Sequence, residues 1–129
     1  MIANAIDHSE GKGVLIKVAQ TEHEVGVGVR DYGIGFSERE GDRLFDRFWR
    51  ADPSRSRLRG GTGLGLAIAL EDAQLHEGTL KAWGRPNLGA HFVLTLPKSP
   101  GIPIAAEPIA VIPEDAPSTT LFEIDTDDI

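Results

Sequence analysis

Two glycine clusters are the residues of this 129-residue chain whose types and spacing could serve chemistry. The first is Asp31-Tyr32-Gly33-Ile34-Gly35, and the second is Gly60-Gly61-Thr62-Gly63-Leu64-Gly65. Glycine lets a backbone approach an anion closely, and the free N–H groups at a helix N-terminus bind phosphate. The second cluster lies directly before a helix-like pattern, so it indicates an anion-binding loop. Either cluster alone is also compatible with a loop that only needs positive φ angles.

Positive charge gathers directly before the second cluster. Seven arginines fall between residues 39 and 59: Arg39, Arg43, Arg47, Arg50, Arg55, Arg57 and Arg59. Two well-known phosphate loops do not fit this arrangement. A Walker A loop needs a lysine after its last glycine, which neither cluster has. A Rossmann fingerprint needs its glycines between the strand and the helix of one βαβ unit, whereas the second cluster follows a long arginine-rich loop.

Composition narrows the class of protein further. The length allows one domain, and the absence of cysteine excludes disulfides, a thiolate nucleophile and cysteine-ligated zinc. No apolar run approaches the roughly 20 residues that cross a bilayer. Asp7 and Glu10 interrupt any resemblance to a signal peptide. These features predict a cytoplasmic segment that makes no membrane contact.

The last quarter of the chain differs in composition from the rest. Residues 98–129 contain five of the eight prolines, and they carry seven acidic residues against one basic residue, Lys98. Prolines at this spacing sustain neither a helix nor a central strand. We therefore predict a domain over 1–97 and a mostly disordered, Pro-rich acidic extension over 98–129. Because the chain has no globally basic surface, nucleic acid is not an expected partner.

Hydrophobic periodicity predicts a layered α/β domain. Alternating apolar residues indicate four strands, and a two-sided apolar pattern indicates a buried helix over 63–76, with Gly78 as its C′ residue. A shorter charged helix is expected to begin at Ser37 and to end near Trp49. The chain should open on the last turns of a helix, and the helix over 63–76 should pack on the sheet. The expected strands are 14–20, 24–31, 79–84 and 91–96.

Together, the motifs resemble the ATP-binding domain of sensor histidine kinases, the HATPase_c family. The resemblance covers residues 1–97, and the wording FWRADPSR before GGTGLGLAI is similar to that of actinobacterial MtrB-type kinases. All five motifs occur in the family's order and at its spacing. They are the end of an N box at 4–9, a G1 box at 31–36, an F box at 44–50, a G2 box at 61–68 and a closing strand at 89–97.

The resemblance implies a Bergerat fold, a two-layer α/β sandwich with helices on one face of a mixed sheet, incomplete at its N-terminus. It also implies that Asn4 binds Mg²⁺, that Asp31 accepts a hydrogen bond from the adenine amino group, and that the G2 glycines wrap the phosphates. No catalytic residue is implied. The implied nucleotide-binding set is Asn4, His8, Asp31, Gly33, Gly35, Arg57, Gly61, Thr62, Gly63, Leu64 and Gly65.

Three positions depart from the family's pattern. Asp7 stands where relatives often carry a base that faces the phosphates, so Arg55, Arg57 or Arg59 is expected to supply that charge. His8 occupies a position that lies against the nucleotide in relatives, but a solvent-facing histidine fits there equally well. Ala90 stands where many relatives have Ser or Thr, so one water-mediated contact to the region of Asp31 should be missing.

The resemblance predicts that this chain is a fragment of a longer kinase. Met1 falls inside the N box, and no histidine lies in a phosphoacceptor sequence. The chain is thus expected to be the ATP-binding catalytic domain of a sensor histidine kinase, with ATP and Mg²⁺ as cofactors and no activity on its own. A membrane-anchored parent would add a dimerisation and phosphoacceptor domain and a response regulator as partners. Two alternatives remain: a non-catalytic truncated module that binds nucleotide weakly or not at all, and an anti-sigma-factor-type Ser/Thr kinase, against which the F box FDRFWR argues.

Overall fold

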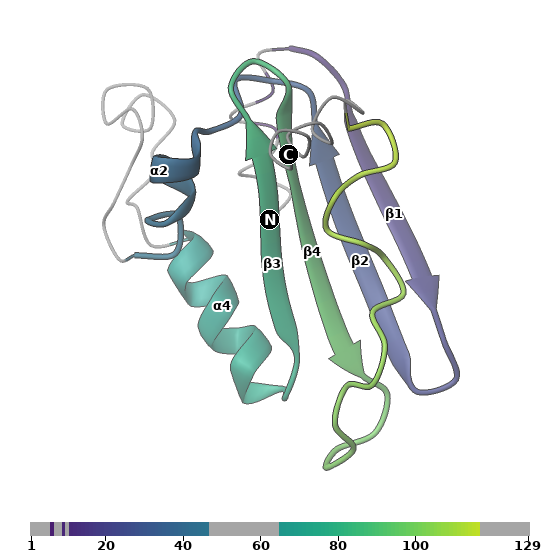
Figure 1. The fold of residues 1–129 in the computed structure, drawn as a ribbon. Helices are drawn as coiled ribbons and strands as arrows, with labels where there is room; N and C mark the ends of the chain where they lie inside the picture. Colours follow the sequence, from purple (N-terminus) through teal and green to yellow (C-terminus); the bar gives the residue numbers. More distant parts are fainter. Residues whose placement is uncertain (1–5, 7–8, 10, 47–64, 117–129) are drawn as a thin grey trace, which may run out of the picture.

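One antiparallel sheet forms the centre of the chain (Figure 1). The structure is a computed structural model, and it describes Ile6, Ser9, residues 11–46 and residues 65–116. The sheet has the order β1-β2-β4-β3, and the helices α2 (Glu38–Gly41) and α4 (Gly65–Leu75) lie on one side of it. The predicted α/β class, with helices on one face, is confirmed. All three described strand pairings are antiparallel. The strands are β1 (Val14–Gln20), β2 (Glu24–Asp31), β3 (Thr79–Arg85) and β4 (Gly89–Pro97).

The two faces of β2 carry different residue types. Val27 and Val29 line a cavity of about 390 Å³ beneath α4, together with apolar residues of β3 and β4. Because side chains alternate along a strand, Asp31 shares this helix-facing side. Gly26, Gly28 and Arg30 face the opposite side. The last residues of β2 thus send a carboxylate to one face of the sheet and a guanidinium to the other.

Helix α4 ends in a Schellman motif, but not at the glycine that the sequence suggested. The Gly78 N–H donates to the Ala73 carbonyl over 2.7 Å, and the Glu77 N–H donates to the Gln74 carbonyl over 3.0 Å. Glu77, with φ of 63°, is therefore the left-handed C′ residue. The prediction of Gly78 at C′ was wrong. Gly78 is needed for a different reason, since a Cβ there would lie 2.4 Å from the Thr95 carbonyl oxygen.

The charged helix predicted over 37–49 is much shorter in the structure. Ser37 and Glu40 form a capping box at its start, and the helix ends at Gly41. Turns follow as far as Asp46, and residues 47–49 lie outside the described part. The helix is short because it buries none of its residues, so no packing supports a longer one.

Residues 101–116, which we call the strap, cross the face of the sheet opposite the helices. Ile109 is 4% exposed and covers Gly26 and Gly28; a Cβ at Gly26 would lie 3.4 Å from its Cγ1. Near the start of β2, the Glu24 carboxylate accepts the N–H groups of Ala105, at 2.9 Å, and Ala106, at 3.4 Å. This part of the predicted disordered extension thus has defined contacts, because two positions without side chains leave a trough that Ile109 fills. Residues 117–129 lie outside the described part, and a domain boundary after residue 97 stays a prediction.

Glu24 should make attachment of the strap sensitive to acid. Its hydrogen bonds from the Thr21 hydroxyl and from Ala105 hold the pKa of Glu24 below its ordinary value of 4.5. A depressed pKa contributes stability that is present above 4.5 and is lost as pH falls through the folded-state value. Glu24→Gln should therefore lower the free energy of unfolding at neutral pH, and this deficit should shrink in acid. Urea denaturation across pH measures it, with the exposed Glu22→Gln as the matched control. A deficit that stays constant from neutral to acidic pH would contradict the assignment.

Candidate functional site

Asp31 is a buried carboxylate at the end of β2. Its side chain is among the most buried in the described part of the chain, with 1% of the residue exposed. The carboxylate oxygen Oδ1 accepts the N–H of Gly33 over 3.1 Å, which turns the chain out of the strand. Asp31 lies opposite Ala90 in the pairing of β2 with β4, so a hydroxyl at position 90 would lie beside it. Alanine at position 90 offers no hydroxyl to the carboxylate, and the predicted loss of a water-mediated contact near Asp31 stays a prediction.

The loop after Asp31 packs directly on the turn between β3 and β4. The Asn87 N–H donates to the Ile34 carbonyl over 2.8 Å. Gly35 has φ of 63°, and a Cβ there would lie 1.9 Å from the Arg85 carbonyl oxygen. This contact between two backbones leaves no room for a side chain. The structure thus brings Asp31, Gly33 and Gly35 together on one braced loop, in agreement with the predicted grouping.

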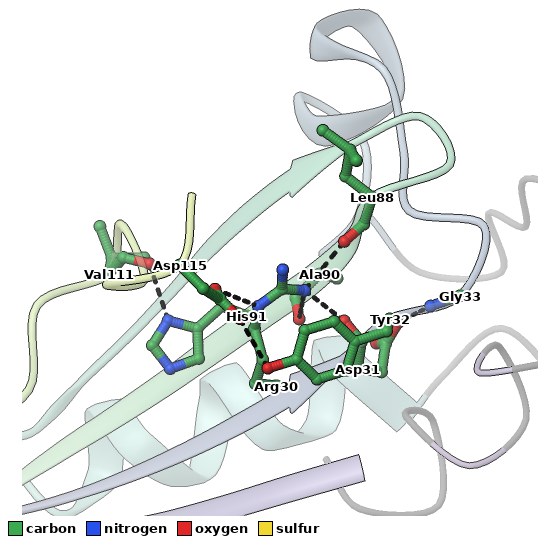
Figure 2. Close-up of polar contacts among 9 residues, drawn as sticks. All are labelled: Arg30, Asp31, Tyr32, Gly33, Leu88, Ala90, His91, Val111 and Asp115. Atoms are coloured by element: carbon green, nitrogen blue, oxygen red, sulfur yellow. Dashed lines mark hydrogen bonds and ion pairs between the residues drawn. The ribbon is translucent and has the colours of Figure 1, made fainter. Parts of the chain in front are cut away.

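Arg30 supports the same loop from the opposite face of the sheet (Figure 2). Its Nη1 donates to the Asp31 carbonyl and, over 3.0 Å, to the Leu88 carbonyl. Its Nε donates to Oδ1 of Asp115 over 3.1 Å. The guanidinium also lies over the Tyr32 ring, 4.2 Å from the ring centroid. Arg30 therefore connects the base of the loop to the β3–β4 turn and to the strap.

Asp115 and Tyr32 form a second polar contact beside Arg30. The Tyr32 hydroxyl donates to Oδ2 of Asp115 over 2.6 Å. This hydrogen bond, and then the contacts from Arg30, hold the pKa of Asp115 below its ordinary value. The same hydrogen bond raises the pKa of Tyr32. At neutral pH the pair is therefore a carboxylate and a neutral phenol.

Sequence reasoning did not find Arg30 and Asp115. The alternation in β2 does place Arg30 on the same face as Gly26 and Gly28, which is a sign that something covers that face. Nothing in the composition of residues 98–129 indicates which residue meets Arg30. The two partners are 85 residues apart, so no local spacing connects them.

The start of α4 has the properties of an anion-binding helix end. Gly65 is its first described residue, and the first turn has no acidic side chain that would repel an anion. Among the described residues, no atom lies within 4 Å of a Cβ built at Gly65, so none of them requires glycine there. Backbone N–H groups at the start of a helix can donate to a phosphate group.

Part of the predicted binding set lies outside the described residues: Asn4, His8, Arg57, Gly61, Thr62, Gly63 and Leu64. Their roles stay predictions. Within residues 11–46 and 65–116, and at Ile6 and Ser9, no group of three or more metal-ligating side chains is arranged to hold a metal ion. In the same ranges no helix has the length and hydrophobicity that a bilayer crossing requires.

Comparisons with known proteins agree with this geometry. The family model described as "Histidine kinase-, DNA gyrase B-, and HSP90-like ATPase" matches residues 1–100. The sensor histidine kinase MtrB of Mycobacterium leprae is 56% identical over 118 residues, which are 92% of this chain and 21% of that protein. MtrB of Mycolicibacterium paratuberculosis is 54% identical over 120 residues, with 92% and 21% covered. The chain thus spans about a fifth of the length of these relatives.

A solved structure extends the likeness to three dimensions. The crystal structure of full-length ShkA in complex with AMPPNP superposes with a TM-score of 0.63 and 29% sequence identity. The match covers 83% of this chain and 21% of ShkA.

Proposed function

Because this chain belongs to the histidine kinase-, DNA gyrase B- and HSP90-like ATPase family, we propose that it is the ATP-binding catalytic part of a sensor histidine kinase. The resemblance predicted from the five motifs is confirmed by this membership. The observation that carries the proposal is Asp31, a carboxylate with 1% exposure on a loop whose backbone is braced against the β3–β4 turn. A buried carboxylate in a fixed position can discriminate between bases, because only a base with a donor at the matching position can hydrogen-bond to it.

The described residues suit two parts of ATP. Asp31 would accept a hydrogen bond from the adenine amino group, while Gly33 and Gly35 keep the loop free of side chains beside the base. The first turn of α4 would donate its free N–H groups to the phosphates, where Gly65 leaves room for them. Mg²⁺ would neutralise phosphate charge when bound, and Asn4 is its proposed ligand. The protein's contribution is therefore positioning and charge complementarity.

The activity of the whole protein is proposed on the same basis. A sensor histidine kinase transfers a phosphoryl group from ATP to a histidine nitrogen, and a response regulator then takes it on an aspartate. The 129 residues would supply nucleotide binding to this reaction, while a membrane-anchored parent would supply the phosphoacceptor histidine. Two of the relatives named above carry the name sensor histidine kinase, and nothing in the comparisons favours a Ser/Thr kinase.

Nucleotide titration tests the proposal directly. Isothermal calorimetry of the 129-residue chain should give ATP binding in the presence of Mg²⁺, and weaker binding of inosine triphosphate. Inosine triphosphate carries a carbonyl oxygen in place of the adenine amino group, so it offers Asp31 no donor at that position. Absence of ATP binding both by this chain and by a longer parent would refute the proposal.

Substitution of Gly65 should separate its role in binding from its role in folding. Since a Cβ at Gly65 meets nothing within 4 Å, Gly65→Ala should leave the free energy of unfolding unchanged or raise it by about 0.5–1 kcal/mol. The same methyl group would occupy the space beside the phosphates, so ATP affinity should fall about tenfold. Gly13→Ala is the matched control, because a Cβ there also meets nothing within 4 Å. Unchanged ATP affinity in Gly65→Ala would place the phosphates elsewhere.

A further inference from the structure

The strap holds both sequence neighbours of Asp31 with a single carboxylate. Asp115 accepts Nε of Arg30 over 3.1 Å with one oxygen and the hydroxyl of Tyr32 over 2.6 Å with the other. Arg30 precedes Asp31 and Tyr32 follows it. We call this pair of hydrogen bonds the Asp115 bridge; Figure 2 shows it on the side of the sheet that carries Arg30.

Arg30 links the strap to the loop that begins at Asp31. Its side chain is 7% exposed, and its Nη1 donates to the backbone carbonyl of Asp31 itself. A second bond, to the Leu88 carbonyl, fixes the same guanidinium to the β3–β4 turn. A buried guanidinium must keep its donors hydrogen-bonded. If its contact with Asp115 changes, the guanidinium shifts and its hydrogen bonds to the Asp31 and Leu88 carbonyls change as well.

Three further contacts keep Asp115 within reach of Arg30. Ile109 is buried on the glycines of β2, and the Glu24 carboxylate holds the backbone of the strap at the opposite end of that strand. Nearer to Asp115, Nδ1 of His91 lies 2.8 Å from the Val111 carbonyl, which can only accept, so this nitrogen carries the hydrogen. Because these three contacts already hold the strap on the sheet, formation of the Asp115 bridge has to order only a few additional residues.

We propose that Asp115 is a positioning residue for nucleotide recognition: through Arg30 and Tyr32, the strap fixes the loop that presents Asp31 to the adenine base. The inference rests on the proposed function, because it assigns to Asp31 the reading of the base. The strap begins directly after the family match to residues 1–100, and the proposal makes it part of the nucleotide site. Loosening the bridge should then weaken the contact that Asp31 makes more than the contacts of the phosphates.

The test measures the affinities for two nucleotides and the hydrogen-exchange rate of one backbone amide in the 129-residue chain. In Asp115→Asn, calorimetry should show ATP affinity lowered about threefold to tenfold, with the affinity for inosine triphosphate almost unchanged. Without nucleotide, NMR should show faster hydrogen exchange of the Gly33 amide, which donates to Asp31. Tyr32→Phe removes one bond of the bridge and keeps the ring over Arg30, so it should give a smaller change of the same kind.

Two controls separate positioning from a general loss of stability. Glu114→Gln removes the neighbouring carboxylate, whose side chain is 93% exposed, and should change neither quantity. Asp115→Glu keeps the carboxylate and should restore part of the ratio of ATP to inosine triphosphate affinity. The proposal is overturned if Asp115→Asn and Tyr32→Phe both leave that ratio and the exchange of Gly33 as in the wild type. A wild-type chain that does not distinguish the two nucleotides would instead contradict the role of Asp31, and the exchange rates would then decide on the bridge alone.

Discussion

Asp31→Ala is expected to remove most of the ATP affinity of this chain. The carboxylate is buried, with 1% of the residue exposed, so its loss leaves the adenine amino group without its acceptor. A buried unpaired donor costs about 1–3 kcal/mol, which corresponds to roughly a 5- to 150-fold loss in affinity. A single arginine among those before the G2 glycines should matter less, because the neighbouring arginines share its charge-neutralising role. Calorimetry of Asp31→Ala beside Arg57→Ala measures the ranking.

A second substitution shows whether the loss of ATP affinity comes from the missing hydrogen bond to the base or from a disturbed loop after position 31. Asp31→Asn keeps one oxygen that can accept the Gly33 N–H, and it presents an amide donor where the second carboxylate oxygen was. ATP binding should still fall, because two donors now face each other, whereas inosine triphosphate should bind as well as before or better. Equal losses in Asp31→Ala and Arg57→Ala, or an Asp31→Asn variant that still prefers ATP, would reject the assignment of Asp31 to the base.

Gly89→Ala should cause a large loss of stability. Gly89 has φ of 94°, and a Cβ there would lie 2.0 Å from the Asp31 carbonyl oxygen and 2.7 Å from Nη1 of Arg30. Backbone strain costs about 1–3 kcal/mol, and an overfilled contact costs a similar amount, so we expect a loss of about 2–5 kcal/mol. Because whole domains are stable by about 5–15 kcal/mol, this is a large part of the margin. Urea denaturation followed by circular dichroism measures it.

Gly101→Ala isolates the contribution of strain. Gly101 also has a left-handed φ, 81°, but a Cβ there would meet nothing within 4 Å. Its replacement should therefore cost only the strain, about 1 kcal/mol. If the two alanine variants were equally stable, the close approach between the β3–β4 turn and the end of β2 would not exist in solution.

The sequence predicted the sheet well because each strand has its own local signal. Alternating valines set β2 between Glu24 and Asp31, and the glycine motif after it places the base-reading loop at the end of that strand. The signal for α2 was misleading, because charged residues with good helix propensity do not extend a helix that buries none of its side chains. The contact of Arg30 with Asp115 depends on the path of the strap across the whole sheet. No periodicity in 98–129 encodes that path, so only the structure reveals it.

The length of chain between Arg30 and Asp115 also sets the order in which parts of the domain fold. The β1–β2 hairpin needs only a three-residue connection, so its contacts can form early, whereas the bridge closes a loop of 85 residues. The entropic cost of closure rises with loop length, and β4 must already be in place to give the strap a surface. During synthesis, Asp115 also leaves the ribosome after all four strands of the described sheet. The sheet should therefore form before the base-reading loop is fixed, and competence to recognise ATP should appear as a late, separate kinetic phase.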